Sequence, residues 1–319
     1  MNWEQENGRI EESVLSCLCY FDVFRHPLTI GELHAFLPGV TISLDSLREK
    51  IHSHPLNKIV KSKDDYFYLF DRNAHIISRR LEAERIAARR WRTAKRMTKI
   101  IKMFPYVRAV MISGDLSKNV SHEKSDIDYF ILTEPGSLWI SRTLLILFKK
   151  TFLLNRRTYY CLNFFRTTDY LEFKSHRDYF TATELITLKP VYNAPAFEQL
   201  LDANRWVFSF FPNVQMNGQQ HRHSSERRSK TQILLEALLN FLPREYLDSK
   251  IMHYMETMWR KRYIELSDNE IAYRFRCTKD ESTAFVEGSK AEILKQYSSR
   301  MNYLNELLYN GKHAITESV

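Results

Sequence analysis

The sequence predicts an α+β protein with a mixed sheet flanked by helices, a small N-terminal unit and a mostly helical C-terminal region. Apolar residues recur at helical spacing near both ends of the 319-residue chain. Short apolar runs with the pattern of strands alternate with helical segments in the middle. An apolar fraction of 44% suits a folded globular chain, and the length suits two or three domains.

Residues 1–72 are predicted to form a small unit of three helices and a hairpin. Thr29, followed three residues later by Glu32, has the capping-box pattern of a helix start. Ser43 can cap the next helix through its hydroxyl. The predicted elements are helices over 10–24, after Thr29 and over 44–53, and strands over 58–61 and 66–70. Three helices followed by a two-stranded wing resemble a winged-helix domain, a variant of helix-turn-helix.

A long basic helix is predicted over residues 74–103, in a connecting segment of residues 73–105 that ends at Pro105. Residues 79–102 contain ten Lys or Arg and two Glu, so they carry +8 of the net charge of +9. Steps of three and four residues stack five of these side chains on one helix face. We name this set the basic stripe: Arg85, Arg89, Arg92, Arg96 and Lys99. Either the stripe contacts a nucleic-acid backbone or a triphosphate tail, or it is a solvated helix face.

Residues 106–215 are expected to form the central domain, and residues 216–319 the mostly helical C-terminal region. The strands predicted in the central domain cover 107–113, 127–133, 159–165 and 170–173, and its helices 138–154, 183–188 and 196–204. A polar stretch over 213–230 predicts a linker or mobile loop. The C-terminal region is predicted to hold helices over 231–242, 245–266 and 289–309 and a strand over 271–276.

The most informative segment joins the first two strands of the central domain. The first strand ends in a small-residue turn at Ser113 and Gly114, and about ten polar residues later Asp126 and Asp128 open the next strand. Side chains two apart on a strand project from the same face, roughly 6–7 Å apart. Two such carboxylates can hold Mg²⁺ through oxygen ligands, and the ion can bridge a triphosphate. A glycine in the turn lets backbone N–H groups approach phosphate oxygens.

This segment resembles the signature of the polymerase-β-like nucleotidyltransferase superfamily. That signature consists of an apolar strand, a Gly-Ser turn, about ten residues and an Asp-x-Asp that opens the next strand. Over residues 10–215 the chain resembles bacterial proteins that join a winged-helix-like N-terminus to this domain. The segments that carry this likeness are Tyr20–Phe24, Ser125–Asp128, Thr133–Gly136 and Cys161–Phe165. Glycosyltransferases also use Asp-x-Asp, but there the pair usually closes a strand, whereas here it opens one.

The resemblance implies transfer of a nucleoside monophosphate from a nucleoside triphosphate to an unidentified hydroxyl or phosphate acceptor, with Mg²⁺ or Mn²⁺ as cofactor. It implies that Asp126 and Asp128 are catalytic and bind the metal. The residues that it places around the nucleotide are Ser113, Gly114, Asp115, Ser117 and Ser125.

Two departures from the family pattern leave alternatives open. Asp115 stands where the family has a serine, and an aspartate repels a phosphate unless a metal or an arginine intervenes. Asn163 occupies the strand of the third family carboxylate, so Glu172, in the predicted strand over 170–173, is preferred to Asp169 for that role. The alternative function is a degenerate nucleotidyltransferase that acts as a nucleotide-sensing or nucleic-acid-binding regulator.

The third helix of the N-terminal unit carries Asp45 and Glu49 against Arg48 and Lys50, so these four charges cancel. That balance is unfavourable for a helix in a DNA groove. Nucleic-acid contact by this unit, and a packing or partner role, both stay open.

No membrane partner is expected. The longest uncharged apolar run, residues 143–148, is far shorter than the roughly 20 residues of a membrane span. The four cysteines form neither a CxxC pair nor the spacing of a disulfide framework, and the sequence starts without a signal peptide. These features indicate a cytoplasmic protein.

Overall fold

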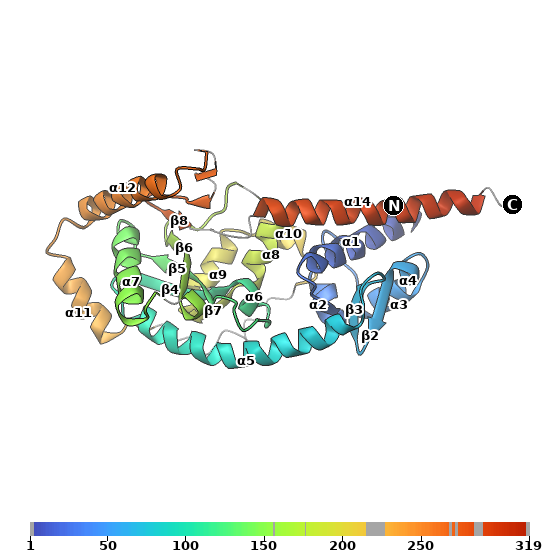
Figure 1. Ribbon diagram of the computed structural model, residues 1–319, viewed down its shortest axis with the longest axis horizontal. Coiled ribbons are helices and arrows are strands. Elements are labelled where there is room, and N and C mark those ends of the chain that lie inside the picture. The colour runs from blue at the N-terminus through green and yellow to red at the C-terminus, as the bar shows by residue number, and fades with distance from the viewer. Residues whose placement is uncertain are drawn as a thin grey trace.

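A five-stranded mixed sheet forms the centre of the protein, as the computed structural model in Figure 1 shows. The structure describes residues 3–155, 157–175, 177–214, 227–267, 270–271, 274–283 and 290–316. The strands are β4 (Val107–Ser113), β5 (Asp128–Thr133), β6 (Cys161–Thr167), β7 (Lys189–Tyr192) and β8 (Glu281–Thr283). Their order is β7-β4-β5-β6-β8, with β5 parallel to β6 and the other pairs antiparallel. The prediction of an α+β chain with a mixed sheet flanked by helices is confirmed.

Helices cover both faces of this sheet because alternate side chains of its inner strands are apolar on both sides. Val110 and Ile112 face one core, and Ala109 and Met111 face the other. On the first side lie α5 (His75–Ile101), α7 (Leu138–Phe152) and α12 (Arg244–Arg262). On the second side lie α8 (Tyr179–Thr187), α9 (Ala194–Asp202) and α10 (Trp206–Phe210). The remaining short elements of this part are α6 (Gly114–Ser117), η1 (Arg157–Tyr159) and α11 (Lys230–Leu239).

The N-terminal unit has its own antiparallel sheet, in the order β1-β3-β2. Its elements are α1 (Trp3–Val23), β1 (Leu28–Thr29), α2 (Ile30–Ala35), α3 (Leu44–His52), α4 (Leu56–Ile59), β2 (Val60–Lys63) and β3 (Tyr66–Leu69). Both predicted caps are confirmed: Thr29 and Glu32 form the capping box, and Ser43 Oγ accepts from the N–H of Ser46 at 3.1 Å. The first hairpin strand begins later than predicted because residues 58 and 59 belong to α4.

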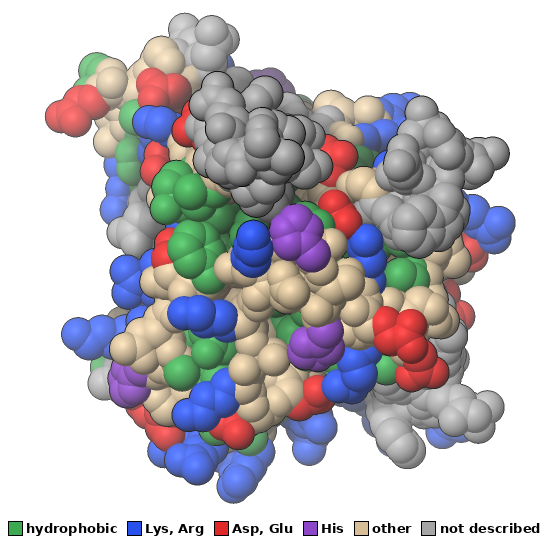
Figure 2. Space-filling model, turned by 90° about the vertical axis from the view of Figure 1, so that its right-hand side faces the viewer, with side chains coloured by type: hydrophobic (Ala, Val, Ile, Leu, Met, Phe, Trp, Pro, Cys, Tyr) green, Lys and Arg blue, Asp and Glu red, His purple; other side chains and the backbone are tan. Residues whose placement is uncertain are grey.

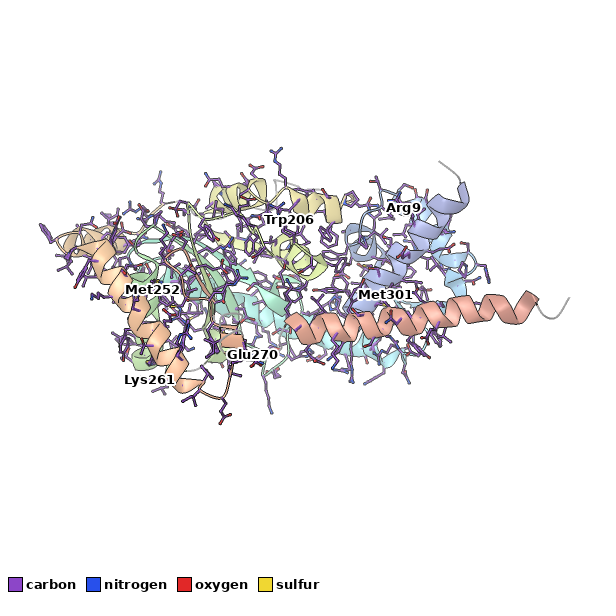
Figure 3. All side chains as sticks on the ribbon, turned by 90° about the horizontal axis from the view of Figure 1, so that it is seen from above. Arg9, Trp206, Met252, Lys261, Glu270 and Met301 are labelled. Carbon is purple, nitrogen blue, oxygen red and sulfur yellow. The ribbon has the colours of Figure 1, made fainter. Side chains whose placement is uncertain are left out.

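The N-terminal unit shares one hydrophobic core with the central sheet. Leu15 and Leu33 belong to the same buried cluster as Met111 and Phe130. The long helix α14 (Lys290–Thr316) closes this core from above and runs along α1, as Figures 1 and 3 show, with Met301 packed against the cluster. The last part of the chain therefore stabilises the first.

Charged contacts hold α14 and α5 to the N-terminal unit. Arg300 of α14 pairs with Asp22 at 3.1 Å and with Asp71. Buried Arg80 of α5 pairs with Glu32 at 2.6 Å. α5 then continues below the sheet, so it joins the N-terminal unit to the central part of the protein (Figure 1).

Two predicted strands are wrong. Residues 170–173 form no strand, because Asn204 binds this segment instead: its Nδ2 donates to the carbonyl of Leu171 and its Oδ1 accepts from the N–H of Phe173, each at 2.8 Å. Ile271 and Arg274 are helical, and the strand of this region is β8, paired with β6. Most of the predicted linker, residues 215–226, lies outside the described residues. In the parts of the chain that are described, no helix combines the length and apolarity needed to cross a membrane.

Candidate active site

The turn after β4 is in direct contact with the start of β5. Ser113, the last residue of β4, pairs across the sheet with Asp128, the first residue of β5. Gly114 then adopts a φ of +65°, a region that L side chains rarely enter. A Cβ on Gly114 would lie 2.8 Å from Asp128 Oδ2. Glycine is therefore required here both by the backbone conformation and by the approach of the carboxylate.

Asp126 and Asp128 flank the buried Ile127, and both are half-buried. Burial, with the negative charges of Asp126, Asp115 and Glu184, raises the pKa of Asp128 to about 6, although a hydrogen bond with the Cys161 thiol opposes the shift. Three other carboxylates thus add negative charge around Asp128. Such an excess of negative charge favours binding of a cation or a proton.

Asp115 lies in the first turn of α6 and adds to this negative charge. Although Asp115 keeps an exposed surface, desolvation by the surrounding protein raises the pKa of its carboxyl group. Lys118 and His122 oppose the shift, and Glu184 contributes to it. Lys118 Nζ donates to Glu184 Oε1 at 2.8 Å and to the carbonyl oxygen of Gly114 at 3.3 Å. The nearest lysine is therefore already paired with a carboxylate.

Glu184 and Lys118 were not identified from the sequence. Glu184 stands on α8, close to 60 residues after Asp126, inside an ordinary amphipathic helix. Only the packing of α8 over the sheet brings its carboxylate near Asp115 and Asp128.

The serines of the predicted nucleotide site make local hydrogen bonds. Ser117 is buried, and its hydroxyl donates to the carbonyl of Gly114 at 2.7 Å, so it faces the turn itself. Ser113 Oγ is 3.5 Å from the carbonyl oxygen of Asp128. Ser125 Oγ accepts from the N–H of His122 at 3.2 Å. Ser113 and Ser125 are half-buried, and they are the serines that can still reach a ligand at this turn.

A buried arginine positions the loop that precedes the two aspartates. Arg90 of α5 donates to the carbonyl oxygens of His122 and Glu123, each at 3.1 Å, to that of Ser125, and to that of Thr158 at 2.7 Å. Bonds from a charged donor to several backbone carbonyls hold a loop in one conformation. The sequence showed Arg90 only as one of ten basic residues in the segment 79–102, because nothing local separates it from the exposed ones.

The five residues of the basic stripe are all exposed on the solvent side of α5. Arg85 pairs with Glu82 at 3.5 Å, and Arg89 pairs with Glu123 at 3.2 Å. Glu123 belongs to the loop that leads to Asp126, so the stripe passes beside the candidate site.

Glu172, the predicted third carboxylate, does not lie near Asp126 and Asp128. It follows β6, whose last residue, Thr167, pairs with Thr133 at the opposite end of the sheet from Asp128. At the surface its carboxylate accepts from Arg177 at 2.7 Å. The carboxylate that tertiary packing adds to the site is Glu184.

Within the described ranges, no group of three or more His, Cys, Asp or Glu side chains is arranged to hold a metal ion. A pair of aspartates is nevertheless a usual protein contribution to Mg²⁺ binding, since this ion takes its other ligands from water and substrate phosphates. The oxygen donors of Asp126 and Asp128, and the like charge around them, fit such an ion.

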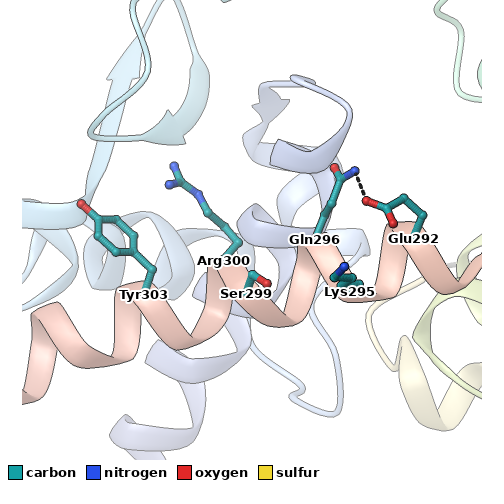
Figure 4. A pocket seen from close by; sticks show the side chains of 6 residues that line it. All are labelled: Glu292, Lys295, Gln296, Ser299, Arg300 and Tyr303. Carbon is teal, nitrogen blue, oxygen red and sulfur yellow. Dashed lines mark hydrogen bonds between the residues drawn. The ribbon is translucent and has the colours of Figure 1, made fainter.

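Two other surfaces are less suited to a nucleotide. A shallow cavity of about 330 Å³ lies on α14, and Arg300 is one of the residues that line it (Figure 4). Arg300 is already bound by Asp22 and Asp71. On α3, Arg48 pairs with Asp65 at 3.4 Å and Lys50 with Glu11 at 2.8 Å. The coloured part of that end of the molecule mixes basic and acidic side chains (Figure 2).

No family model, curated protein or solved structure matches this chain, so its function has to be inferred from this geometry.

Proposed function

We propose that this protein is a nucleotidyltransferase that moves a nucleoside monophosphate from a nucleoside triphosphate to an acceptor. The observation that carries the proposal is the contact between the Gly114 turn and Asp128. A strand, a tight glycine turn and a carboxylate that opens the neighbouring strand are the arrangement expected from the superfamily that the segment resembles. The resemblance of the N-terminal unit to a winged helix is supported by the helices α1, α2 and α3, followed by the short α4, and by a small antiparallel sheet.

In this proposal Asp126 and Asp128 hold Mg²⁺ or Mn²⁺ by their carboxylate oxygens. When bound, such an ion would supply positive charge that offsets the negative charge of the leaving pyrophosphate. A bound cation would favour the deprotonated form of Asp128, whose pKa burial and the neighbouring carboxylates raise to about 6. Arg90 acts through the loop that it fixes, and therefore has a positioning role.

The proposal predicts metal-dependent labelling of an acceptor. The full-length protein would be incubated with each of the four α-labelled nucleoside triphosphates, Mg²⁺ or Mn²⁺, and cell extract. We expect label in one fraction of the extract, lost in Asp126→Asn and Asp128→Asn. Asp202→Asn, at an exposed carboxylate on α9, is the matched control and should label as the wild type does. Labelling that survives both site substitutions would contradict the assignment.

Asp115 supports a second candidate, a degenerate nucleotidyltransferase that senses a nucleotide or binds nucleic acid. Its carboxylate adds negative charge to the turn, and Lys118 is occupied by Glu184. Two like unit charges 4 Å apart cost on the order of 1 kcal/mol in water and about 4 kcal/mol at an effective dielectric constant of 20. Those energies correspond to roughly fivefold to several-hundredfold in affinity.

Asp115→Ser separates the two candidates. The measurement is the dissociation constant of a non-hydrolysable triphosphate with and without Mg²⁺. Tighter binding together with new transfer activity would favour the regulator, because the natural residue then opposes the phosphates. A loss of Mg²⁺ dependence would make Asp115 part of the catalytic site. Unchanged binding would mean that Asp115 faces away from the phosphates.

A further inference from the structure

Lys118 and Glu184 form a partly buried ion pair beside the Gly114 turn. Lys118 directly follows the short helix α6, and its Nζ donates to Glu184 Oε1 at 2.8 Å and to the carbonyl oxygen of Gly114 at 3.3 Å. The two side chains are 14% and 30% exposed. A lysine carries a compact ammonium on a flexible stem, so it can exchange one anionic partner for another without a change in the backbone.

The Gly114 turn needs a cation if phosphates are to approach it. The carboxylates around Asp128 give this part of the protein an excess of negative charge. A triphosphate adds more, and like charges held close together oppose its binding. Lys118 and His122 are the cationic groups that most oppose the raised pKa of Asp115, and Lys118 has the larger effect. Lys118 is therefore the cation best placed to bind a phosphate oxygen at the turn.

A buried tyrosine hydroxyl of the N-terminal unit lies near Glu184. Tyr20 of α1 packs edge-on against Tyr179 of α8, with ring centroids 4.7 Å apart. Burial and, to a smaller extent, the charge of Glu184 raise the pKa of the Tyr20 hydroxyl. In the part of the chain that the structure describes, this hydroxyl has no partner within hydrogen-bond distance. Thr183 lies near it too, but donates its own proton to the carbonyl oxygen of Tyr179 at 2.8 Å. A carboxylate that moves toward Tyr20 would therefore gain a hydrogen bond that the buried hydroxyl now lacks.

We propose that Lys118 is a phosphate ligand of the candidate site and that Glu184 competes with the triphosphate for it. When a triphosphate occupies the Gly114 turn, the Lys118 ammonium binds a phosphate oxygen, and Glu184 accepts a hydrogen bond from Tyr20 instead. This inference rests on the proposed function, which places the phosphates at this turn. Figure 1 shows α6 on the side of the sheet that faces the N-terminal unit, so the exchange links nucleotide binding to that unit.

The simpler role for Lys118 is to neutralise Glu184. Lys118→Met alone does not separate the two roles, because it leaves an unpaired carboxylate that would itself repel the phosphates. The decisive comparison is made in Glu184→Gln, where a phosphate ligand still binds but a neutralising group has nothing left to neutralise. The double variant replaces a partly buried ion pair by neutral side chains of similar size, a change that proteins usually tolerate.

Calorimetry of the full-length protein with Mg²⁺ and non-hydrolysable analogues of ATP, GTP, CTP and UTP measures these affinities. We expect Glu184→Gln to bind the preferred analogue at least about fivefold more tightly than the wild type. Adding Lys118→Met to that variant should weaken binding by about tenfold to a hundredfold, the loss of one hydrogen bond between charged groups. Adding Lys118→Arg, which keeps the charge, should weaken binding less. Lys230→Met, at an exposed lysine of α11, is the matched control and should not change the affinity of either background.

Tyr20→Phe tests where Glu184 goes. In the wild-type background it should weaken binding by about threefold to tenfold, because Glu184 then has no new donor when Lys118 leaves it. In Glu184→Gln it should have no effect. Tyr160→Phe removes another buried hydroxyl that lacks a partner among the described residues, and it should bind as the wild type does.

Two results would overturn the exchange while leaving the proposed function standing. One is a double variant, Lys118→Met with Glu184→Gln, that binds as tightly as Glu184→Gln alone. The other is Tyr20→Phe binding as tightly as the wild type. A wild-type protein that binds none of the four analogues would overturn both the exchange and the proposed function.

Discussion

Gly114→Ala should damage the candidate site more than its small size suggests. The residue has a φ of +65°, and an alanine in the left-handed region costs about 1–2 kcal/mol. The new methyl group would also lie 2.8 Å from Asp128 Oδ2, whereas ordinary van der Waals contact starts at 3.4 Å. The carboxylate must therefore move by about 0.6 Å or the turn must open. Either change alters the position of a proposed metal ligand relative to the turn.

Gly39→Ala is the matched control for this substitution. Gly39 has the same φ of +65°, but an added Cβ there would meet nothing within 4 Å. Both variants should lose about 1–2 kcal/mol of unfolding free energy through the backbone, measured by urea denaturation. Only Gly114→Ala should also lose affinity for a triphosphate with Mg²⁺, measured by calorimetry. Equal affinities in the two variants would refute the role given to the contact between Gly114 and Asp128.

Three further predictions concern charged groups. Burial and the neighbouring carboxylates raise the pKa of Asp128 from its ordinary value of 3.8 to about 6 in the folded protein. The folded state therefore favours the protonated carboxyl group, and this contribution to the free energy of unfolding is fully present below pH 3.8 and is lost as the pH rises through about 6. Asp128→Asn should therefore be more stable than the wild type at pH 7, on the order of 1–2 kcal/mol, and equally stable near pH 4, as urea denaturation at both pH values would show. Replacing the four arginines of the basic stripe by Gln should reduce the salt dependence of any nucleic-acid binding by about 0.7–0.9 log unit of slope per lost phosphate contact. An unchanged slope in a salt titration would leave the stripe as a solvated helix face. Arg90→Met should cost about 2–4 kcal/mol of unfolding free energy and weaken triphosphate binding, because four carbonyl groups lose their donor. Arg79→Met, at an exposed residue of the same helix outside the basic stripe, should change neither quantity, and equal effects of the two substitutions would count against the positioning role.

Local signals predicted much of the fold and the core of the site. The caps at Thr29 and Ser43 are confirmed, since a cap depends on residues within one helical turn. The strand that ends at Ser113 was predicted with its observed limits, and the strand that contains Asp128 within one residue at its start. Strands this apolar and β-branched carry a clear pattern. The short edge strands β7 and β8 were missed because three or four residues carry too little pattern.

The sequence alone determined the α+β class, the glycine turn and the pair of aspartates, because each of these depends on neighbours along the chain. Tertiary structure decided which other groups reach that turn. The packing of α8 places Glu184 near the turn, and Lys118 forms an ion pair with it. Arg90 differs from the other arginines of α5 in being buried against the loop and bonded to its carbonyl groups. Tertiary structure also decided that α11 presents its polar side inward, since its buried residues are Gln232 and Glu236. Such contacts join residues tens of positions apart, and their energies depend on burial and distance, which no local spacing of residue types encodes.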